Sequence, residues 1–550
     1  MRQEAVAAGD YRPAESPPIA QVMSRRRLWY FLAAVIFLVV TGIPTLVIPL
    51  SSDEAVYALG ARTVLRGGQL YRDFWDIKPP LIYLSYAVPV AVDAAQVESY
   101  RVFHLFVIGS GMAGVFFVTA RYFSDRAALI AACFYCFAYF GVAWLGNQGE
   151  AESFMAGPLL LALAVYKTAE KGSYPSAFLA GMLLGIGCAF KLSSVLFVLG
   201  LPLAELLFKQ EGWTPSGAIK RLACAGAAFL LVQAVWIGYL NAAGVWSAYV
   251  DIQRNYTIPY NQFRWLEGTT LVRSILDPTG DWFNKNAYLV APAWAAVFIS
   301  FFRGNRPAVS LLTFLSVIAL ITVWWQGKYF DYQWLIMLPF LAPLAGFSVD
   351  QALDLVRALP RRDAAVAKAV LAAGFMILAI WPLYRVYEHY GVLLQRVSGS
   401  LTRAGVEQHY LGEFGANRQI VEHIRENSSA DDGFLVFGFW PQPYIWEERP
   451  LPSRFVTSAS VRSTWSPAKW RRELIADLIV NKPRFIAVAA GDHQPWLTGS
   501  GHASDQYLCD AWPELRQLIE ENYRAVINNG LFVLYDREAR EHLALPRCVA

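Results

Sequence analysis

Long apolar runs recur from Leu28 to about residue 387, and they constrain the fold of this chain more than any other feature. A helix needs roughly 20 apolar residues to cross the hydrocarbon core of a membrane, and these runs approach that length. Only 16% of the residues are charged, whereas soluble proteins average about 25%. The sequence therefore predicts a polytopic α-helical membrane protein.

About eleven spans can be placed if each needs roughly 20 residues. They are 28–50, 101–121, 127–145, 153–167, 176–190, 192–208, 222–241, 286–302, 308–325, 333–348 and 366–386. Arg25, Arg26 and Arg27 precede the first span, which places the N-terminus in the cytoplasm by the positive-inside rule. The segment 176–208 could be one helix or two. We divide it at Lys191, because a single helix would move every later basic link outside. The odd count places the C-terminus outside.

Three regions follow from this pattern. Residues 1–24 are polar and rich in Ala and Pro, which predicts a disordered cytoplasmic tail. Residues 25–387 form the membrane domain, with large outer loops at 51–100 and 242–285. Residues 388–550 alternate helices with short apolar strands, which predicts an extracytoplasmic α/β domain. Strands are expected at 434–438, 485–489 and 531–535, and helices at 417–427, 467–480 and 512–522.

Composition argues against some partners and leaves others open. The net charge of +4 is too small to indicate nucleic acid. The seven histidines show no spacing of a metal site, although a divalent cation held by Asp53, Glu54 or Glu152 is left open. Cys509 and Cys548 lie in the outer domain, where an oxidising compartment permits a disulfide. The other four cysteines lie in predicted spans, where a thiol packs as a small apolar group.

An acidic pair, Asp53 and Glu54, directly follows the first span. Ser51 and Glu54 have the spacing of a capping box, which predicts a helix from Ser52 and explains Glu54 without any chemistry. A glutamine would serve in that box as well. Asp53 is not needed by the box, so it is the stronger functional candidate.

The helix that follows the acidic pair is expected to end at Gly67-Gly68, where a glycine can adopt the left-handed cap. Val56 and Leu59 fall on one face, and Arg62 and Arg66 fall on the other. This pattern predicts an amphipathic helix that lies in the membrane interface.

The same loop returns to the membrane through Trp75-Asp76-Ile77-Lys78-Pro79-Pro80. A proline restricts the residue before it to an extended backbone, which gives the Lys78 side chain a fixed direction. A lysine there can hold a phosphate as a point charge. The alternative is a snorkelling lysine that pairs only with lipid headgroups. These residues alone favour neither interpretation.

The acidic pair after span one, the Gly-Gly-x-x-Tyr break and the Lys-Pro-Pro entry to a helix together resemble a known family. It is the protein O-mannosyltransferase-like branch of the C-type glycosyltransferases (GT-C), to which the bacterial aminoarabinose transferase of lipid A also belongs. The resemblance covers residues 28–350 and implies a GT-C-like fold. It implies that Asp53 is the essential carboxylate and that Lys78 contacts a lipid phosphate. Val56 stands where the aminoarabinose branch has an arginine, and Asp76 is two residues from the lysine rather than adjacent, so the aminoarabinose substrate itself is not implied.

Further candidates lie at other outer turns. Glu150 and Glu152 open span four, and Glu152 is the better candidate for a substrate contact, although an acid at a helix start can also serve the helix dipole. Lys191 is an ionisable residue at membrane depth. Lys328 lies in a turn that resembles the family's loop before the tenth span and is a second phosphate candidate. The predicted substrate-binding residues are Glu54, Tyr57, Asp76, Lys78, Glu152, Lys191 and Lys328, with Asp53 catalytic and no metal ligand assigned.

The resemblance and these residues predict a polyprenyl-phosphate-sugar-dependent glycosyltransferase of a bacterial inner membrane. It would move a hexosyl or pentosyl group to a lipid, glycan or protein acceptor on the periplasmic face. Asp53 would be the general base. Lys78, helped by Lys191 or Lys328, would stabilise the departing phosphate. The alternative is a transporter or flippase for lipid-linked sugars, but such proteins often show internal repeats and helices broken at the midplane, which are not evident here.

Overall fold

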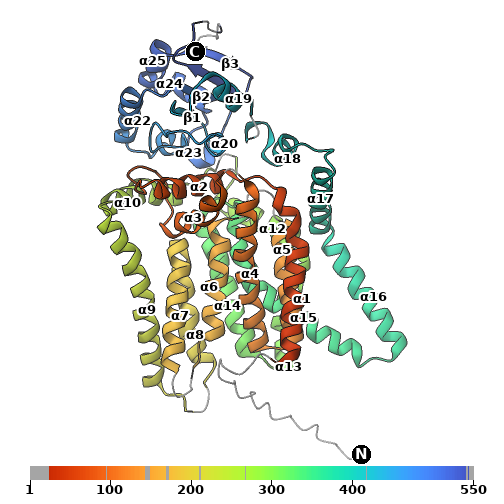
Figure 1. Cartoon of the computed structure of the whole chain (residues 1–550). Coiled ribbons are helices and arrows are strands. Elements are labelled where there is room, and N and C mark those ends of the chain that lie inside the picture. Colours follow the sequence, from red (N-terminus) through yellow and green to blue (C-terminus); the bar gives the residue numbers. More distant parts are fainter. Residues whose placement is uncertain are drawn as a thin grey trace, which may run out of the picture.

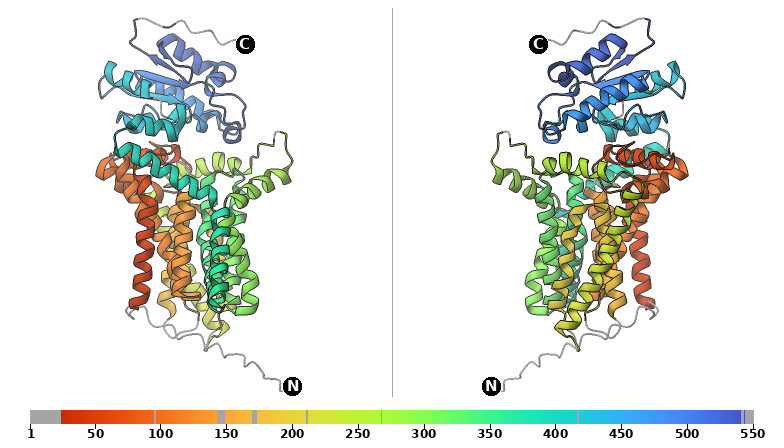
Figure 2. Two further views of the ribbon diagram at one scale, coloured as in Figure 1. Left: turned by 90° about the vertical axis from the view of Figure 1, so that its right-hand side faces the viewer. Right: turned by 90° about the vertical axis from the view of Figure 1, so that its left-hand side faces the viewer.

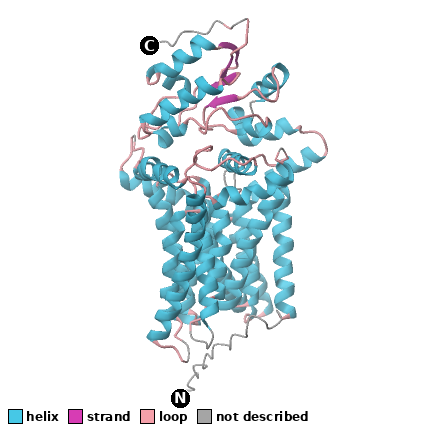
Figure 3. Ribbon diagram, turned by 60° about the vertical axis from the view of Figure 1, so that its left-hand side comes forward, coloured by secondary structure: helices cyan, strands magenta, loops and turns pink. Residues whose placement is uncertain are grey.

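The computed structural model describes residues 24–94, 96–142, 149–168, 173–209, 212–266, 268–415, 418–540 and 543. This part of the chain forms a bundle of long helices and a smaller domain that lies against one end of the bundle (Figure 1). Both side views show the smaller domain stacked over the same end, which we call the upper end (Figure 2). The strands lie in the smaller domain (Figure 3).

Six helices of the described chain are long and apolar enough to cross a membrane, or up to eight if each of two bent pairs is one span. The six are α1 with the turn η1 (Arg25–Val47), α4 (Val97–Tyr122), α7 (Ser173–Phe190), α9 (Pro215–Ala242), α14 (Arg306–Gln326), and η5 with α15 (Asp331–Arg357). The bent pairs are α12 (Leu271–Lys285) with α13 (Ala287–Arg303), at 96°, and α16 (Arg361–Leu378) with α17 (Ile380–Val397), at 67°. A multi-pass membrane protein is therefore confirmed.

Further apolar helices complete the bundle. They are α5 (Asp125–Val142) and α6 (Ala151–Val165), which both pack against α4, and α8 (Gly200–Leu207). The predicted total of eleven spans counts these helices as well as the six and the two bent pairs, so that number stays a prediction.

The chain crosses the bundle twice between residues 173 and 207, because it turns at Lys191. This residue is extended, with φ −155° and ψ 122°, and it separates α7 from η3 (Leu192–Leu199) and α8. The start of α7 and the end of α8 contact the same part of α9: Cys224 donates to the Tyr174 carbonyl, and Arg221 pairs with Glu205. A 3-10 helix rises about 2.0 Å per residue, so η3 and α8 together can span about 28 Å. The helix break is where the sequence predicts it.

Three short helices lie between the bundle and the smaller domain (Figure 1). They are α2 (Ser52–Leu65), α3 (Leu81–Asp93) and α10 (Trp246–Ile252). The predicted outer loops 51–100 and 242–285 thus contain a good deal of helix, and they form the surface on which the smaller domain sits.

The smaller domain covers the face of α2 that was expected to be polar, and the position of this helix in the membrane interface stays a prediction. Arg62, expected on the polar face, is only 7% exposed. Arg66 pairs with Glu448 at 2.8 Å, and Gln442 Nε2 donates to Ser52 Oγ at 3.2 Å. Arg62 therefore faces protein, and burial lowers its pKa to about 10, whereas the Arg66 side chain stays 52% exposed.

The smaller domain holds one four-stranded sheet in the order β1-β2-β4-β3. Its strands are β1 (Phe434–Phe437), β2 (Phe485–Ala489), β3 (Arg524–Asn528) and β4 (Phe532–Asp536). The first two are parallel and fully buried, and the other pairings are antiparallel. Helices α19 (Arg418–Asn427), α22 (Ala468–Asn481) and α25 (Pro513–Asn522) and three of the strands lie within one residue of their predicted bounds.

The predicted domain boundary differs from the structure, and two predictions concern residues at the ends of the chain. The predicted boundary between the membrane domain and the smaller domain, at residue 388, lies inside α17. Of the predicted tail, residues 1–24, only residue 24 is among the described residues. Cys548 lies outside them. Cys509 is disulfide-bonded, whereas Cys133, Cys136, Cys188 and Cys224 are free thiols.

Candidate active site

Five separate segments of the chain meet at the upper end of the bundle. Asp53 is the second residue of α2, Lys78 precedes α3, Glu152 is in the first turn of α6, Lys191 follows α7, and Tyr332 is in η5. The charges of Lys78, Glu152 and Lys191 all act on Asp53. Most of these side chains keep some exposure to solvent, so a ligand can reach them.

Asp53 and Glu54 face different surroundings, because consecutive residues of an α-helix point about 100° apart. Asp53 is partly exposed, and Tyr332 is placed to hydrogen-bond to it. Burial raises the pKa of Asp53, while Lys78 opposes that rise. A carboxylate with a raised pKa accepts a proton more readily, which suits a base.

Glu54 is fully buried and its oxygens already have partners. The backbone N–H of Ser51 donates to Oε2 at 2.7 Å and the Ser51 hydroxyl accepts from the Glu54 N–H, so the predicted capping box is present. Arg101 of α4 binds both carboxylate oxygens, at 2.6 and 3.0 Å. These contacts favour a structural role for Glu54 over the predicted contact with substrate.

Gly149 brings the chain before α6 against this buried pair. A Cβ at Gly149 would overlap His104, Tyr86 and Glu54, and its φ of 68° also favours glycine. The Tyr86 hydroxyl donates to the Gly149 carbonyl at 2.9 Å. The close approach fixes the start of α6, which carries the acids of the site.

The Lys78 side chain presents a charged amine that an anion could bind. Its amine lies 5.9 Å from the ring centroids of both Tyr57 and Tyr332, and within the described chain no hydrogen-bond acceptor or counter-ion is in contact with it. Burial opposes the charge of Lys78, but Glu152 and Asp53 outweigh burial and raise its pKa. Lys78 is therefore a cation held between two aromatic rings, partly open to solvent.

Asp76 is bound locally rather than to Lys78. It accepts from the Tyr83 hydroxyl at 2.5 Å and from the Ile77 N–H at 2.7 Å. Both bonds stabilise the turn that leads into α3. Burial raises the pKa of Asp76.

Lys191 bridges two other helices of the bundle. Its amine donates to Glu152 and, at 2.6 Å, to Gln326 Oε1 at the end of α14. The same amine lies 5.8 Å from the Tyr332 ring centroid, so both lysines are near this ring. Glu152 is 1% exposed, and its Oε2 has no hydrogen-bond partner in the described chain.

Tyr57 lies between Lys78 and the start of α6. Its hydroxyl donates to Glu150 Oε2 at 3.1 Å. Glu150 is 1% exposed, and burial, together with the negative charge of Asp53, raises its pKa well above the usual range. A protonated Glu150 would reduce the repulsion among the carboxylates.

Lys328 lies apart from the two other lysines. Its amine donates to the backbone carbonyls of Phe263 and Trp496, at 3.0 and 3.1 Å, so it joins the bundle to the smaller domain. Burial and the nearby Arg264 lower the pKa of Lys328 to about 7. Its contacts are those of a residue that holds the two domains together.

The described residues hold no group of three His, Cys, Asp or Glu side chains that could bind a metal ion. Around Asp53 the neighbouring carboxylates face two ammonium groups, and Lys191 already neutralises Glu152. This donor set fits an anionic ligand better than a divalent cation.

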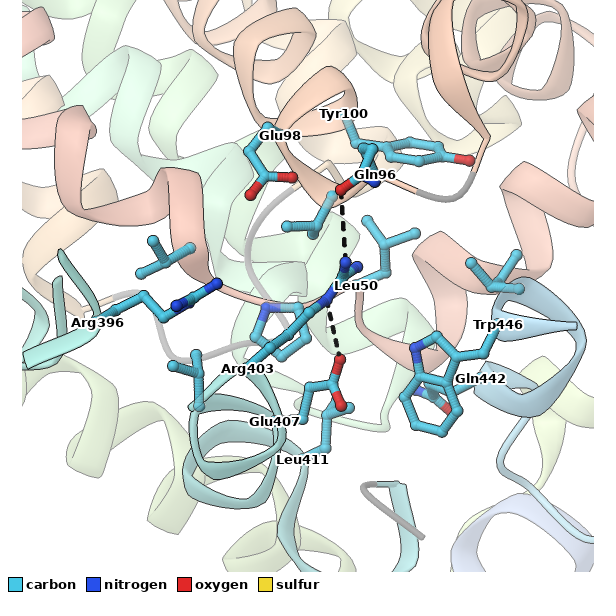
Figure 4. Close-up of a pocket in the computed structure, with 15 residues that line it drawn as sticks. Leu50, Gln96, Glu98, Tyr100, Arg396, Arg403, Glu407, Leu411, Gln442 and Trp446 are labelled. Carbon is cyan, nitrogen blue, oxygen red and sulfur yellow. Dashed lines mark hydrogen bonds and ion pairs between the residues drawn. The ribbon is translucent and has the colours of Figure 1, made fainter. Parts of the chain in front are cut away.

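A separate cavity of about 110 Å³ lies at the seam between the bundle and the smaller domain. Arg403 extends across it between Gln96 and Glu407 (Figure 4). Gln442 and Leu50 also line it, but none of the predicted site residues does.

Sequence reasoning missed three residues of this site. Arg101 is the first residue of a predicted span and has the position of an ordinary flanking charge. An ionisable residue at the end of a span could have been taken as a candidate from the sequence alone. Tyr332 and Gln326 flank the predicted Lys328 turn. Only the fold shows that Tyr332, rather than Lys328, reaches Asp53, and that Gln326 accepts from Lys191.

The comparisons with known proteins agree with this geometry. Residues 78–238 match the family model of the dolichyl-phosphate-mannose-protein mannosyltransferases. The structure is similar to that of ArnT from Cupriavidus metallidurans bound to undecaprenyl phosphate, with a TM-score of 0.59 and 14% identity, over 94% of this chain and 99% of that chain. The apo structure of the same protein gives a TM-score of 0.59 and 15% identity, over 92% and 98%. No curated protein matches the sequence.

The matched stretch includes Lys78, Glu152 and Lys191, whereas Asp53 precedes it. At such low identity, the likeness to the solved structures shows the fold. The resemblance indicated by the first-loop motif is confirmed: the chain has the fold of the C-type glycosyltransferases, and residues 78–238 carry the sequence pattern of their protein-mannosyltransferase branch.

Proposed function

We propose that this protein transfers a sugar from a polyprenyl phosphate to a hydroxyl group of a lipid, glycan or protein acceptor. One observation carries the proposal: a partly exposed carboxylate, Asp53, and an amine without a counter-ion in contact, Lys78, share one site at the upper end of a membrane bundle. The ArnT structure named above holds undecaprenyl phosphate, which supports a lipid phosphate as the donor class.

The reaction is a direct displacement. The acceptor oxygen forms a bond to the anomeric carbon while the bond from that carbon to the phosphate oxygen breaks. Asp53 takes the hydroxyl proton as general base. The electron pair of the broken bond leaves with the lipid phosphate, whose charge Lys78 stabilises.

Lys191, also close to Tyr332, supports this chemistry. Its ammonium keeps Glu152 neutralised, so the negative charge of Glu152 does not oppose an approaching phosphate. It also adds positive potential at the site, which favours the leaving phosphate. Glu152 Oε2, buried without a partner in the described chain, is a suitable acceptor for a sugar hydroxyl.

The position of the site supports action at the outer face of the membrane. The smaller domain and α2, whose first turn carries Asp53, lie at the same end of the bundle (Figure 1). The basic residues before α1 support a cytoplasmic N-terminus. We therefore place the protein in a bacterial inner membrane, with this end in the periplasm.

The test uses the full chain purified in detergent or lipid nanodiscs. Binding of undecaprenyl phosphate is measured first, and mass spectrometry then compares cell-envelope glycans and lipids from cells with and without the gene. We expect micromolar-range binding that depends on Lys78, and the loss of one glycosylated product. If the protein moves a lipid-linked sugar across vesicles but forms no glycosidic product, the transporter interpretation replaces this proposal.

A further inference from the structure

The backbone that carries Lys78 is held by one side chain of its own loop and by one of the second large loop. The Tyr71 hydroxyl donates to the Lys78 carbonyl at 2.7 Å, and Gln253 Nε2 donates to the Ile77 carbonyl at 2.8 Å. Tyr71 is 1% exposed and has a φ of 69°, a left-handed value that is rare for a residue other than glycine. Such a conformation persists only where the surroundings impose it.

The smaller domain supplies part of those surroundings. Arg454 Nη1 donates to the Tyr71 carbonyl at 2.6 Å, and the Arg454 carbonyl accepts from the Trp75 N–H at 3.0 Å. The guanidinium is itself fixed by Glu473, at 2.6 and 2.8 Å. A planar guanidinium with two anchored edges has little freedom to move.

Aromatic packing locks the same loop in place. Trp75 is 6% exposed, and its ring lies 4.8 Å from that of Tyr256, 5.5 Å from Trp470 and 6.4 Å from Phe455 between centroids. Trp470 and Phe455 belong to the smaller domain, whereas Tyr256 belongs to the second large loop. Trp75 is therefore the point where both loops and the smaller domain meet, three residues before Lys78.

We infer that the smaller domain is part of the donor-binding site, because Arg454 and Tyr71 set the position of Lys78. Tyr71 is the link: its carbonyl is held by the smaller domain, and its hydroxyl holds the peptide of Lys78. Both are positioning residues, since neither is in contact with Asp53. The inference rests on the proposed function, in which Lys78 binds the phosphate of a polyprenyl donor.

The decisive variant is Tyr71→Phe, which removes one hydroxyl and keeps the ring. We expect binding of undecaprenyl phosphate to weaken about 2- to 10-fold, the range for a lost hydrogen bond. The KM for the donor should rise, while kcat at saturating donor and the melting temperature change little. A purely structural role would instead lower the melting temperature and leave donor affinity unchanged.

Tyr249→Phe is the matched control. Its ring lies 4.9 Å from that of Tyr71, and its buried hydroxyl has no partner in the described chain. Removing that hydroxyl should leave donor binding unchanged.

Arg454→Met tests the contribution of the smaller domain. It removes the donor to Tyr71 and should weaken undecaprenyl phosphate binding. The double variant with Tyr71→Phe should lose less affinity for undecaprenyl phosphate than the product of the two single fold-losses, because both substitutions act through Lys78. Should Arg454→Met fail to fold, Tyr71→Phe alone decides.

Lys78→Met separates this inference from the function on which it rests. If Lys78→Met weakens lipid phosphate binding but Tyr71→Phe does not, the positioning role is overturned and the proposed function stands. If Lys78→Met itself binds undecaprenyl phosphate normally, Lys78 does not bind the phosphate, and the inference about Tyr71 and Arg454 is overturned as well.

Discussion

Arg101 binds both carboxylate oxygens of Glu54, and neither side chain of this pair is exposed to solvent. The same guanidinium donates to the carbonyls of Ile48 and Pro49, in the segment that joins the first span to α2. The pair thus fixes the direction in which α2 leaves the membrane bundle. Asp53, one residue before Glu54, owes its position to this contact.

The first prediction is that Glu54→Gln destabilises the protein. A capping box alone would accept glutamine, but the substitution leaves the Arg101 charge buried without a counter-charge. Breaking a buried pair in this way costs about 3–5 kcal/mol. Thermal unfolding in detergent should show a clearly lower midpoint. Glu448→Gln, which breaks the exposed pair with Arg66, should change stability by no more than about 1 kcal/mol. An unchanged midpoint for Glu54→Gln would count against the role given to the pair.

A second prediction concerns Asp53→Asn. Asparagine is nearly the same size but cannot take up a proton, so turnover should fall about 10²- to 10⁴-fold, as for a lost general base. Folding and binding of undecaprenyl phosphate should be retained. Asp73→Asn is a matched control, because Asp73 lies in the same loop and pairs at the surface with Arg72. Transfer at the normal rate by purified Asp53→Asn protein would refute the assignment.

Much of the fold could be predicted because hydropathy and basic residues along the chain mark the membrane helices and the links between them. Apolar runs located the long helices, and the basic links required a break at Lys191, which the structure has. Strand β3 was not predicted, because it is an edge strand with Arg524 and Asn528 at its ends, so no apolar run marks it. The burial of Arg62 was not predicted either, since it depends on a domain almost 400 residues later in the chain.

The site residues likewise include some that the sequence could identify and some that it could not. Asp53 and Lys78 could be identified from a local motif whose residues lie close together in sequence. Tyr332 could not, because its place beside Asp53 depends on how η5 packs against α6, α14 and α15. The pairing of Glu54 with Arg101 is also long-range, so the sequence left Glu54 as either a capping-box residue or a substrate contact.

Topology gives a third prediction. The positive-inside rule and the helix break at Lys191 predict that both the smaller domain and the C-terminus lie outside. A phosphatase that is active only in the periplasm should therefore be active when fused after residue 550. A cytoplasmic reporter fused at the same point should be inactive. The reverse result would require an even number of spans.

A fourth prediction uses the pKa of Lys328, which burial and Arg264 lower from its usual value of 10.5 to about 7. Between pH 7 and about 10 the unfolded chain holds a proton on this amine that the folded protein releases. Stability should therefore gain a contribution as the pH rises through this window. Melting curves from pH 6 to pH 9 should show that gain in the natural protein and not in Lys328→Met. Parallel curves for the two proteins would refute the lowered pKa.

The last prediction tests whether Lys78 acts through its charge. A snorkelling lysine pairs with lipid headgroups in general, so losing it would weaken contact with any anionic lipid. A lysine held between Tyr57 and Tyr332 beside Asp53 should instead discriminate for the polyprenyl phosphate. Lys78→Met should lose most of its affinity for undecaprenyl phosphate, whereas Lys78→Arg, which keeps the positive charge, should retain more. Affinity is measured by titration in nanodiscs of neutral lipid. Equal binding by the natural protein and Lys78→Met would return this residue to the snorkelling interpretation.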